Sequence, residues 1–338
     1  MDDSPVARRL PGEDPVLDPA IEVAGTAAAD GNEAVRAAAR LRPDLITMDI
    51  YMPEMDGLAA IQEIMATVPR PILVVTSDRN SKLAYRSLAC GALDVLEKPG
   101  FVEDATPETY AELLGRVRLL SKVKVITHVR GRRQKWSEAL PPIPPGSDEA
   151  PAHHIVAIGA STGGPSVIAK ILGELKADVP AGFVIVQHLS EGFTQGLVQW
   201  LDEVTPLKVK EAMHGDVVEP GVAYVAPADS HAELASGARI FLSKKPLLRG
   251  HRPSADLLFS SLARTMPRKA IGVILTGMGM DGAEGLSELK RAGGRTIAQS
   301  EESCLIFGMP KVAIELGAAE RILPAEGIAE EIARLCRP

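Results

Sequence analysis

Short apolar segments alternate with amphipathic, helix-length patterns along most of this 338-residue chain, and this alternation constrains the fold more than any other feature. Strands that are joined through helices form parallel sheets, which the helices cover on both faces. We therefore predict an α/β fold with doubly wound parallel sheets. The expected strands are 20–25, 45–48, 71–76, 93–96, 154–158, 182–187, 222–226 and 270–276, and the expected helices are 32–41, 57–67, 82–90, 166–175, 193–201, 255–265 and 282–292.

A stretch without this alternation separates two halves of the chain. Residues 130–135 are basic, and residues 141–151 are rich in proline. Proline at this density stiffens a chain and hinders packing, as expected of a spacer. Because 338 residues are enough for two domains of ordinary size, we predict a domain at 1–122, a linker at 123–152 and a second domain at 153–338.

The composition narrows the possible surroundings and partners of the chain. A net charge of −7 argues against nucleic acid as a partner. The three cysteines are far apart, which predicts a reducing compartment and neither a disulfide framework nor a zinc site. No apolar run reaches about 18 residues, and the acidic N-terminus has no apolar signal region. We therefore expect a cytoplasmic protein without direct membrane insertion.

Polar residues follow several expected strands of the first half. Asp49, Thr76 and Lys98 stand at the C-terminal ends of strands, where open parallel sheets place their sites, and Asp2 and Asp3 begin the chain. Carboxylates that gather there repel one another unless a cation joins them, and Mg²⁺ prefers oxygen ligands. Asp49 is then a candidate phosphoryl acceptor, with Lys98 and Mg²⁺ offsetting the added charge. Taken singly, each residue also fits an ordinary surface turn.

Four motifs appear here in a characteristic order: Asp2-Asp3-Ser4, the segment from Met48 to Gly57, Thr76, and Glu97-Lys98-Pro99. Together they resemble a response-regulator receiver domain over residues 2–120. The resemblance implies a flavodoxin-like fold and phosphorylation of Asp49 by a histidine kinase. It also assigns further roles: Mg²⁺ ligands at Asp2, Asp3, Asp49 and the Tyr51 carbonyl, a switch hydroxyl at Thr76, and a phosphate partner at Lys98.

Three features depart from the receiver pattern. Only Met1 precedes the acidic pair, so the first strand is predicted to be missing, through a misassigned start or a truncation. Pro11 and Gly12 interrupt the first helix, and proline inside a helix costs about 3 kcal/mol. Val95 stands where an aromatic residue is common. We expect a receiver that is poorly ordered or weakly phosphorylated.

In the second half, a glycine-rich turn presents a serine directly after an expected strand. Gly159-Ala-Ser161-Thr-Gly163 fits the nucleophile-elbow pattern, in which a sharp strand-to-helix turn exposes the hydroxyl. The glycines allow the tight bend, and Pro165 suits the first turn of a helix. The same segment also fits a tight turn that binds phosphate.

A histidine and an aspartate stand at the ends of two other expected strands. His188 follows strand 182–187, and Asp281 follows strand 270–276 and a glycine-rich turn whose N–H groups are free to face an oxyanion. Convergence on one sheet edge favours a Ser161–His188–Asp281 triad. A rival arrangement joins Ser161 to His251 through Asp216 or Asp229, in the order of an α/β-hydrolase, but its acids lie in weaker turn contexts.

The second half contains six motifs: Ile158 to Pro165, Gln187-His188, Gly192-Phe-Thr194, His251 to Ser254, Leu275 to Gly282, and Phe307 to Pro310. Over residues 153–335 they resemble the chemotaxis protein-glutamate methylesterase family. The resemblance implies a Rossmann-like serine esterase domain with Ser161, His188 and Asp281 as its triad. It places the oxyanion donors at the backbone N–H groups of Thr162 and Met278.

This second resemblance also implies an activity and its control. The substrates are methyl esters of glutamate on methyl-accepting chemotaxis receptors, and particular receptor glutamines are deamidated. No cofactor is expected for ester hydrolysis, and Mg²⁺ is expected for receiver phosphorylation only. The unphosphorylated receiver is expected to cover the active site, and phosphorylation of Asp49 to relieve the block.

Two other classes of protein remain as alternatives. A nucleotide-binding module would use the turn from Gly159 to Gly164, but this turn lacks the Gly-x-Gly-x-x-Gly spacing, and the next strand ends in His188 instead of an acid. A transcription factor would carry a basic helix-turn-helix after the linker, and none follows. Both features favour hydrolysis.

Overall fold

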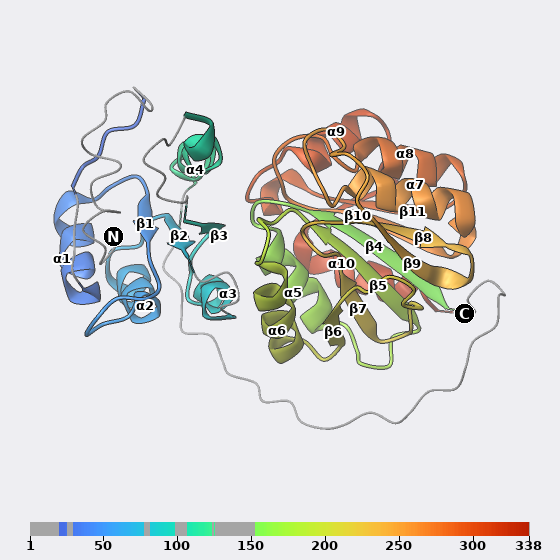
Figure 1. Cartoon of the computed structure of the whole chain (residues 1–338), viewed down its shortest axis with the longest axis horizontal. Coiled ribbons are helices and arrows are strands. Elements are labelled where there is room, and N and C mark those ends of the chain that lie inside the picture. The colour runs from blue at the N-terminus through green and yellow to red at the C-terminus, as the bar shows by residue number, and fades with distance from the viewer. Residues whose placement is uncertain are drawn as a thin grey trace. The chain divides into compact units, whose positions relative to one another are not determined.

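The computed structural model describes residues 20–25, 30–77, 82–98, 107–123, 125 and 153–337. The chain forms two compact units, Met1–Arg133 and Gln134–Pro338 (Figure 1). Nearly all of the predicted linker lies outside the described residues, so the finer domain boundaries stay a prediction. Asp2, Asp3, Pro11 and Gly12 lie outside them too.

The first unit contains a parallel sheet with the strand order β1-β2-β3. The middle strand, β2, is buried along its whole length, as a strand covered on both faces should be. Gly57 approaches the end of β1 so closely that a Cβ atom there would lie 2.1 Å from the Asp49 carbonyl oxygen. The elements are β1 (Ile46–Met48), β2 (Ile72–Thr76), β3 (Asp94–Glu97), α1 (Gly31–Leu41), α2 (Gly57–Thr67), α3 (Lys82–Ala89) and α4 (Pro107–Leu120).

One predicted element of this unit is wrong. Residues 20–25 form no strand. Among the described strands, β1 is at the edge of the sheet and pairs with β2 alone, so residues 20–25 belong to no sheet there. The other expected strands and helices of this half are confirmed, and α4 was not expected.

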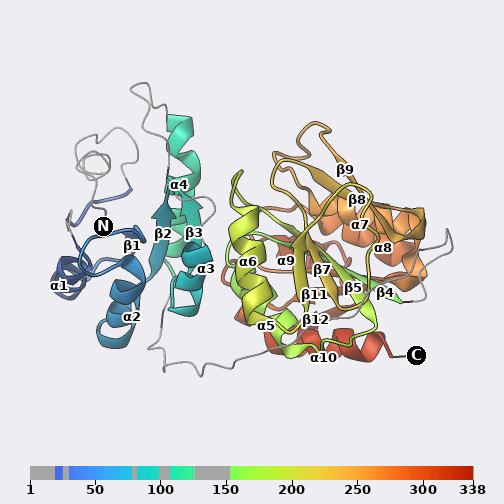
Figure 2. The ribbon, with the colours of Figure 1, turned by 60° about the horizontal axis from the view of Figure 1, so that its bottom comes forward.

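The second unit is built on a parallel sheet with the strand order β12-β11-β10-β4-β5-β7-β6. Helices α5, α6 and α10 cover one face, and α7, α8 and α9 cover the other (Figure 2). The strands are β4 (His154–Ala160), β5 (Ala181–Gln187), β6 (Lys208–Glu211), β7 (Val222–Val225), β10 (Ala270–Ile274), β11 (Arg295–Gln299) and β12 (Arg321–Leu323), and a separate antiparallel pair is formed by β8 (His231–Ala235) and β9 (Arg239–Ser243).

The helices of this unit follow the strands in the expected doubly wound manner. Helices 166–175, 193–201, 255–265 and 282–292 were predicted within one to three residues at most ends. The observed α-helices are α5 (Gly164–Glu174), α6 (Thr194–Val204), α7 (Ala255–Thr265), α8 (Ala283–Arg291), α9 (Met309–Glu315) and α10 (Ala325–Leu335), with 3₁₀ turns at Ser236–Ala238, Pro267–Lys269 and Glu301–Ser303. In the described part of the chain, no helix is both long and apolar enough to cross a membrane.

The strand order predicts a ligand-binding site at the C-terminal ends of the central strands of this sheet. β4 lies between β5 and β10, with Ala160 beside Gln187 and Gly159 beside Ile274. The chain runs outward from β4 in both directions, which makes its C-terminal end a topological switch point, where α/β sheets bind their ligands. Ser161 and His188 directly follow β4 and β5 at this edge.

Candidate active site

Ser161 lies in a sharp turn between β4 and α5. Gly163 caps the helix with a φ of 78°, a backbone conformation that favours glycine. The Ser161 N–H donates to the Thr276 carbonyl at 3.0 Å, and the Gly164 N–H donates to the Ser161 carbonyl at 2.8 Å. This is the strand–turn–helix geometry that the sequence predicted. Ser161 is nevertheless only 6% exposed, because the loop that begins at Gly277 packs against it.

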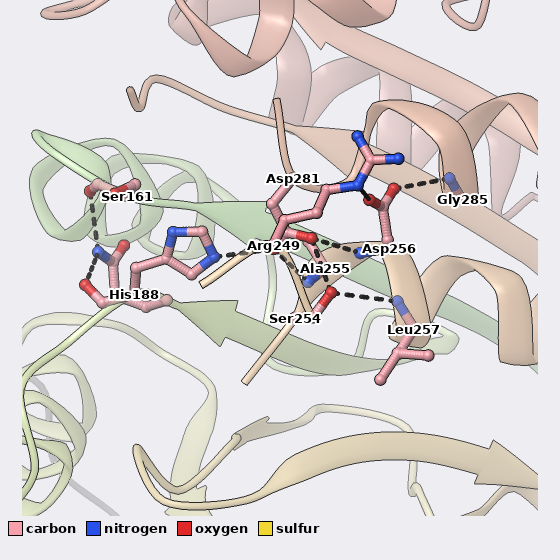
Figure 3. A network of polar contacts seen from close by, with 10 residues as sticks. Ser161, His188, Arg249, Ser254, Ala255, Asp256, Leu257, Asp281 and Gly285 are labelled. Atoms are coloured by element: carbon pink, nitrogen blue, oxygen red, sulfur yellow. Dashed lines mark hydrogen bonds and ion pairs between the residues drawn. The ribbon is translucent and has the colours of Figure 1, made fainter. Parts of the chain in front are cut away.

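His188 directly follows β5 and turns its ring toward Asp281 (Figure 3). Its Nε2 atom lies 2.8 Å from Asp281 Oδ2. Its other ring nitrogen, Nδ1, is buried and has no hydrogen-bond partner among the described residues. An Nε2–H that donates to Asp281 leaves a lone pair on Nδ1, so Nδ1 is the nitrogen available to take a proton.

Asp281 receives several donors besides His188. The Ser254 hydroxyl donates to Oδ1 at 2.7 Å, and the backbone N–H groups of Ala255 and Asp256 donate at 2.7 and 3.1 Å. Burial raises the pKa of Asp281, but the hydrogen bonds from His188, Ser254 and Ala255 and the nearby His188 charge lower it more, to about 2. Asp281 is therefore an anion, as suits a carboxylate that orients an imidazole.

Gln187 joins the two halves of the proposed nucleophile–base pair. Its Nε2 donates to the Ser161 carbonyl at 2.8 Å and to the His188 carbonyl at 3.1 Å. Within the described residues, the Ser161 hydroxyl forms no hydrogen bond with His188. The two residues are linked instead by the Gln187 side chain, which donates to both of their backbone carbonyls. A Cβ atom on Gly164 would lie 2.1 Å from Gln187 Oε1, which explains the glycine there.

His251 stacks on His188 and contacts neither acid of the rival arrangement. The two imidazole centroids are 4.0 Å apart and the rings are nearly parallel. Burial and the neighbouring His188 charge lower the pKa of His251. Asp216 pairs with Lys210, and Asp229 pairs with Lys244. The geometry thus brings His188, and not His251, to an aspartate.

The loop after β10 carries the second predicted oxyanion donor. Gly277 is held by hydrogen bonds from its N–H to the Ile306 carbonyl and from the Met309 N–H to its own carbonyl. The backbone N–H groups of Thr162 and Met278, in contrast, donate to no acceptor in the part of the chain that the structure describes. Two such donors are the groups that a developing oxyanion requires.

Sequence analysis gave no role to three motif residues that support this site. Gln187 and Ser254 bond to members of the proposed triad, and Thr276 Oγ1 donates to the Thr162 carbonyl at 3.0 Å. Gln187 ends β5, Ser254 caps α7, and Thr276 lies two residues after β10. A polar residue in such a position was the signal that could have identified them.

In the first unit, the described residues of the predicted phosphorylation site lie close together. Lys98 Nζ lies 2.8 Å from Asp49 Oδ2, and the Tyr51 N–H donates to Asp49 Oδ1 at 3.4 Å. Thr76 is buried, and its carbonyl accepts the Lys98 N–H at 2.9 Å. Asp49 therefore stands beside a fixed cation, which suits a residue that gains negative charge.

Only two of the four predicted magnesium ligands, Asp49 and the Tyr51 carbonyl, belong to the described residues. The Asp49 carboxylate and the Tyr51 carbonyl are hard oxygen donors of the kind that Mg²⁺ prefers. Across the described residues, however, no group of three or more His, Cys, Asp or Glu side chains gathers to hold a metal. The site thus depends on Asp2 and Asp3, outside the described residues, and stays a prediction.

Known proteins resemble both units. Residues 156–332 match the CheB methylesterase family, and residues 1–106 match the response regulator receiver domain. A protein-glutamate methylesterase/protein-glutamine glutaminase from Anaeromyxobacter dehalogenans is 44% identical, covering 99% of this chain and 96% of the relative. Another from Pyrococcus horikoshii is 38% identical, covering 99% and 92%.

A solved structure supports the fold of the second unit. The catalytic domain of the Thermotoga maritima CheB methylesterase is 43% identical, with a TM-score of 0.53, over 54% of this chain and 99% of that domain. Because the sequence matches span nearly the whole chain, it belongs to the CheB methylesterase family and carries a response regulator receiver domain ahead of its methylesterase domain.

Proposed function

We propose that this chain hydrolyses glutamate methyl esters on methyl-accepting chemotaxis receptors to glutamate and methanol, and deamidates specific receptor glutamines. The observation that carries the proposal is the buried His188–Asp281 pair at the sheet edge where the Ser161 turn also ends. An anionic carboxylate that orients a histidine beside a serine turn suits acyl transfer. The names of the relatives support protein-bound glutamate esters and glutamines as the substrate class, and the resemblance of the motifs to the chemotaxis family supports the receptors.

In this mechanism, His188 Nδ1 takes the proton of Ser161 Oγ as the oxygen attacks the ester carbonyl. Asp281 keeps the proton on Nε2 and stabilises the imidazolium that forms. The N–H groups of Thr162 and Met278 bind the tetrahedral oxyanion, and each such donor contributes about 10²–10³ in rate. Methanol leaves with the proton from His188, and water then hydrolyses the acyl-enzyme by the same route. A glutamine side chain would lose ammonia in place of methanol.

The receiver domain provides the control. We propose that a histidine kinase phosphorylates Asp49, and that Lys98 and Thr76 respond to the phosphoryl group. Asp2, Asp3, Asp49 and the Tyr51 carbonyl would hold a Mg²⁺ ion, which would supply positive charge for that transfer. The chain acts in the cytoplasm, where the receptor signalling regions and the kinase are accessible to it.

The test is methanol release by the full chain from a methyl-esterified receptor fragment, with and without acetyl phosphate. We expect release in both conditions and a faster rate with the phosphodonor. A receptor fragment with glutamine at the same positions should release ammonia. Absence of both products from folded protein would refute the substrate assignment.

A further inference from the structure

A second buried carboxylate, Asp256, lies next to the proposed catalytic acid. It belongs to the first turn of α7, and its backbone N–H donates to Asp281 Oδ1. Its own Oδ1 accepts the backbone N–H of Gly285, in the first turn of α8, at 2.8 Å. Asp281 immediately precedes the cap of α8. Asp256 in α7 therefore accepts an N–H from the first turn of α8. In return, Asp281, which precedes α8, accepts N–H groups from the first turn of α7 (Figure 3).

The role of Asp256 follows from what α8 lacks. The cap residue of α8 is Gly282, which has no side chain to accept an N–H. The first N–H groups of a helix have no acceptor within the helix, so a buried helix start needs one from outside. Asp256 supplies it. The helices also approach closely, since a Cβ atom on Gly285 would lie 2.3 Å from the Asp256 carbonyl oxygen.

Arg249 completes the link between the two helix starts. Its Nε lies 3.8 Å from Asp256 Oδ2, and its Nη2 lies 2.5 Å from Glu284 Oε2 in the first turn of α8. Asp256 Oδ2 is buried and accepts no hydrogen bond within the described residues. Burial and the neighbouring Asp281 charge raise the pKa of Asp256, although the Gly285 N–H and Arg249 lower it, and the result is about 6.

We propose that Asp256 is a positioning residue for the ester hydrolysis reaction, which holds Asp281 in line with His188 by fixing the start of α8 to the start of α7. The inference rests on the proposed triad. Asp281 is four residues from Gly285, so a shift of the α8 start moves the carboxylate that orients His188. Misplacement of a catalytic group by about 1 Å costs on the order of 10² in rate.

The experiment compares three variants of the full chain. Asp256→Ala removes the acceptor for the Gly285 N–H, and Asp256→Asn keeps an acceptor oxygen but removes the charge. Ser261→Ala is the matched control, because this buried hydroxyl accepts the Leu234 N–H further along α7, away from the site. We measure kcat and KM for methanol release, the rate at which a fluorophosphonate probe labels Ser161, and thermal stability.

We expect Asp256→Ala to lower both kcat and the labelling rate on the order of 10- to 100-fold, with KM nearly unchanged. Asp256→Asn should restore most of the labelling rate, and Ser261→Ala should lower stability without slowing labelling of the folded protein. Where Asp256→Ala does not fold, Asp256→Glu replaces it, since the added methylene displaces the acceptor while the charge is kept.

Three results would overturn the proposal: wild-type labelling in Asp256→Ala or Asp256→Glu, an Asp256→Asn variant as slow as Asp256→Ala, or equal slowing by Ser261→Ala. The probe needs no receptor, so labelling separates this inference from the substrate assignment. Wild-type protein that is labelled at Ser161 but releases no methanol would refute the substrate alone.

Discussion

The two units place a carboxylate at the C-terminal edge of a parallel sheet, but they surround it differently. Asp281 receives a histidine, a hydroxyl and two backbone N–H groups and is 1% exposed. Asp49, within the described residues, receives Lys98 and one long hydrogen bond from Tyr51. A carboxylate that orients a partner is held by several hydrogen bonds, whereas one that accepts a phosphoryl group needs an oxygen that can attack the phosphorus. The two sites should therefore respond differently to substitution.

The largest expected effect is that of Ser161→Ala. Loss of a triad nucleophile typically costs about 10⁶ in turnover, and the small side chain suits the tight turn, so the protein should remain folded. Circular dichroism and methanol release are the measurements. Adding His188→Ala should cost little more, because residues that act as a unit are not additive. Near wild-type methanol release from folded Ser161→Ala would eliminate Ser161 as the nucleophile.

Asp281→Asn should cost about 10⁴ in kcat, because an amide opposite His188 reverses the imidazole tautomer. Asp216→Asn is the matched control, since Asp216 pairs with Lys210 away from the triad. It should retain near wild-type kcat. Steady-state methanol release compares the two variants, and a larger loss in Asp216→Asn would favour the rival arrangement with His251.

Acid should weaken the native contacts of Asp281. Its pKa of about 2 lies below the value in an unfolded chain, so its ionised form stabilises the fold above about pH 4, and this contribution is lost as pH falls toward 2. The lowered pKa corresponds to about 2 kcal/mol. Denaturant unfolding should show the penalty of Asp281→Asn shrinking between pH 5 and pH 3. A penalty that does not change with pH would contradict the ionised state.

The smallest expected effect concerns the receiver. If it restrains the esterase, removal of residues 1–150 should raise the rate without phosphodonor by about fivefold, at the low end of usual coupling between sites. The departures at Pro11 and Gly12 motivate a small gain. Asp49→Ala should abolish any response to acetyl phosphate while leaving the basal rate. Equal rates for the full chain and the truncation, with no phosphodonor effect, would mean that the receiver does not regulate.

The central strands and helices of both units were predictable because their apolar patterns are local. β4, β5 and β10 are buried apolar runs, and each was found from sequence. Strand pairing is not local, however. Residues 20–25 have an apolar pattern but no partner strand in the described residues, and β11 and β12 became strands by adding to the edge beyond β10.

The sequence by itself determined the glycine turn at Ser161 and the end of the strand before His188. Both depend on local features, namely an apolar run and the glycine or polar residue that ends it. Only the tertiary structure decided that Nε2 of His188 faces Asp281, that His251 stacks on His188, and that Asp256 caps α8. These contacts join residues tens of positions apart. Their geometry depends on how α7 and α8 pack on the sheet, which no local pattern encodes.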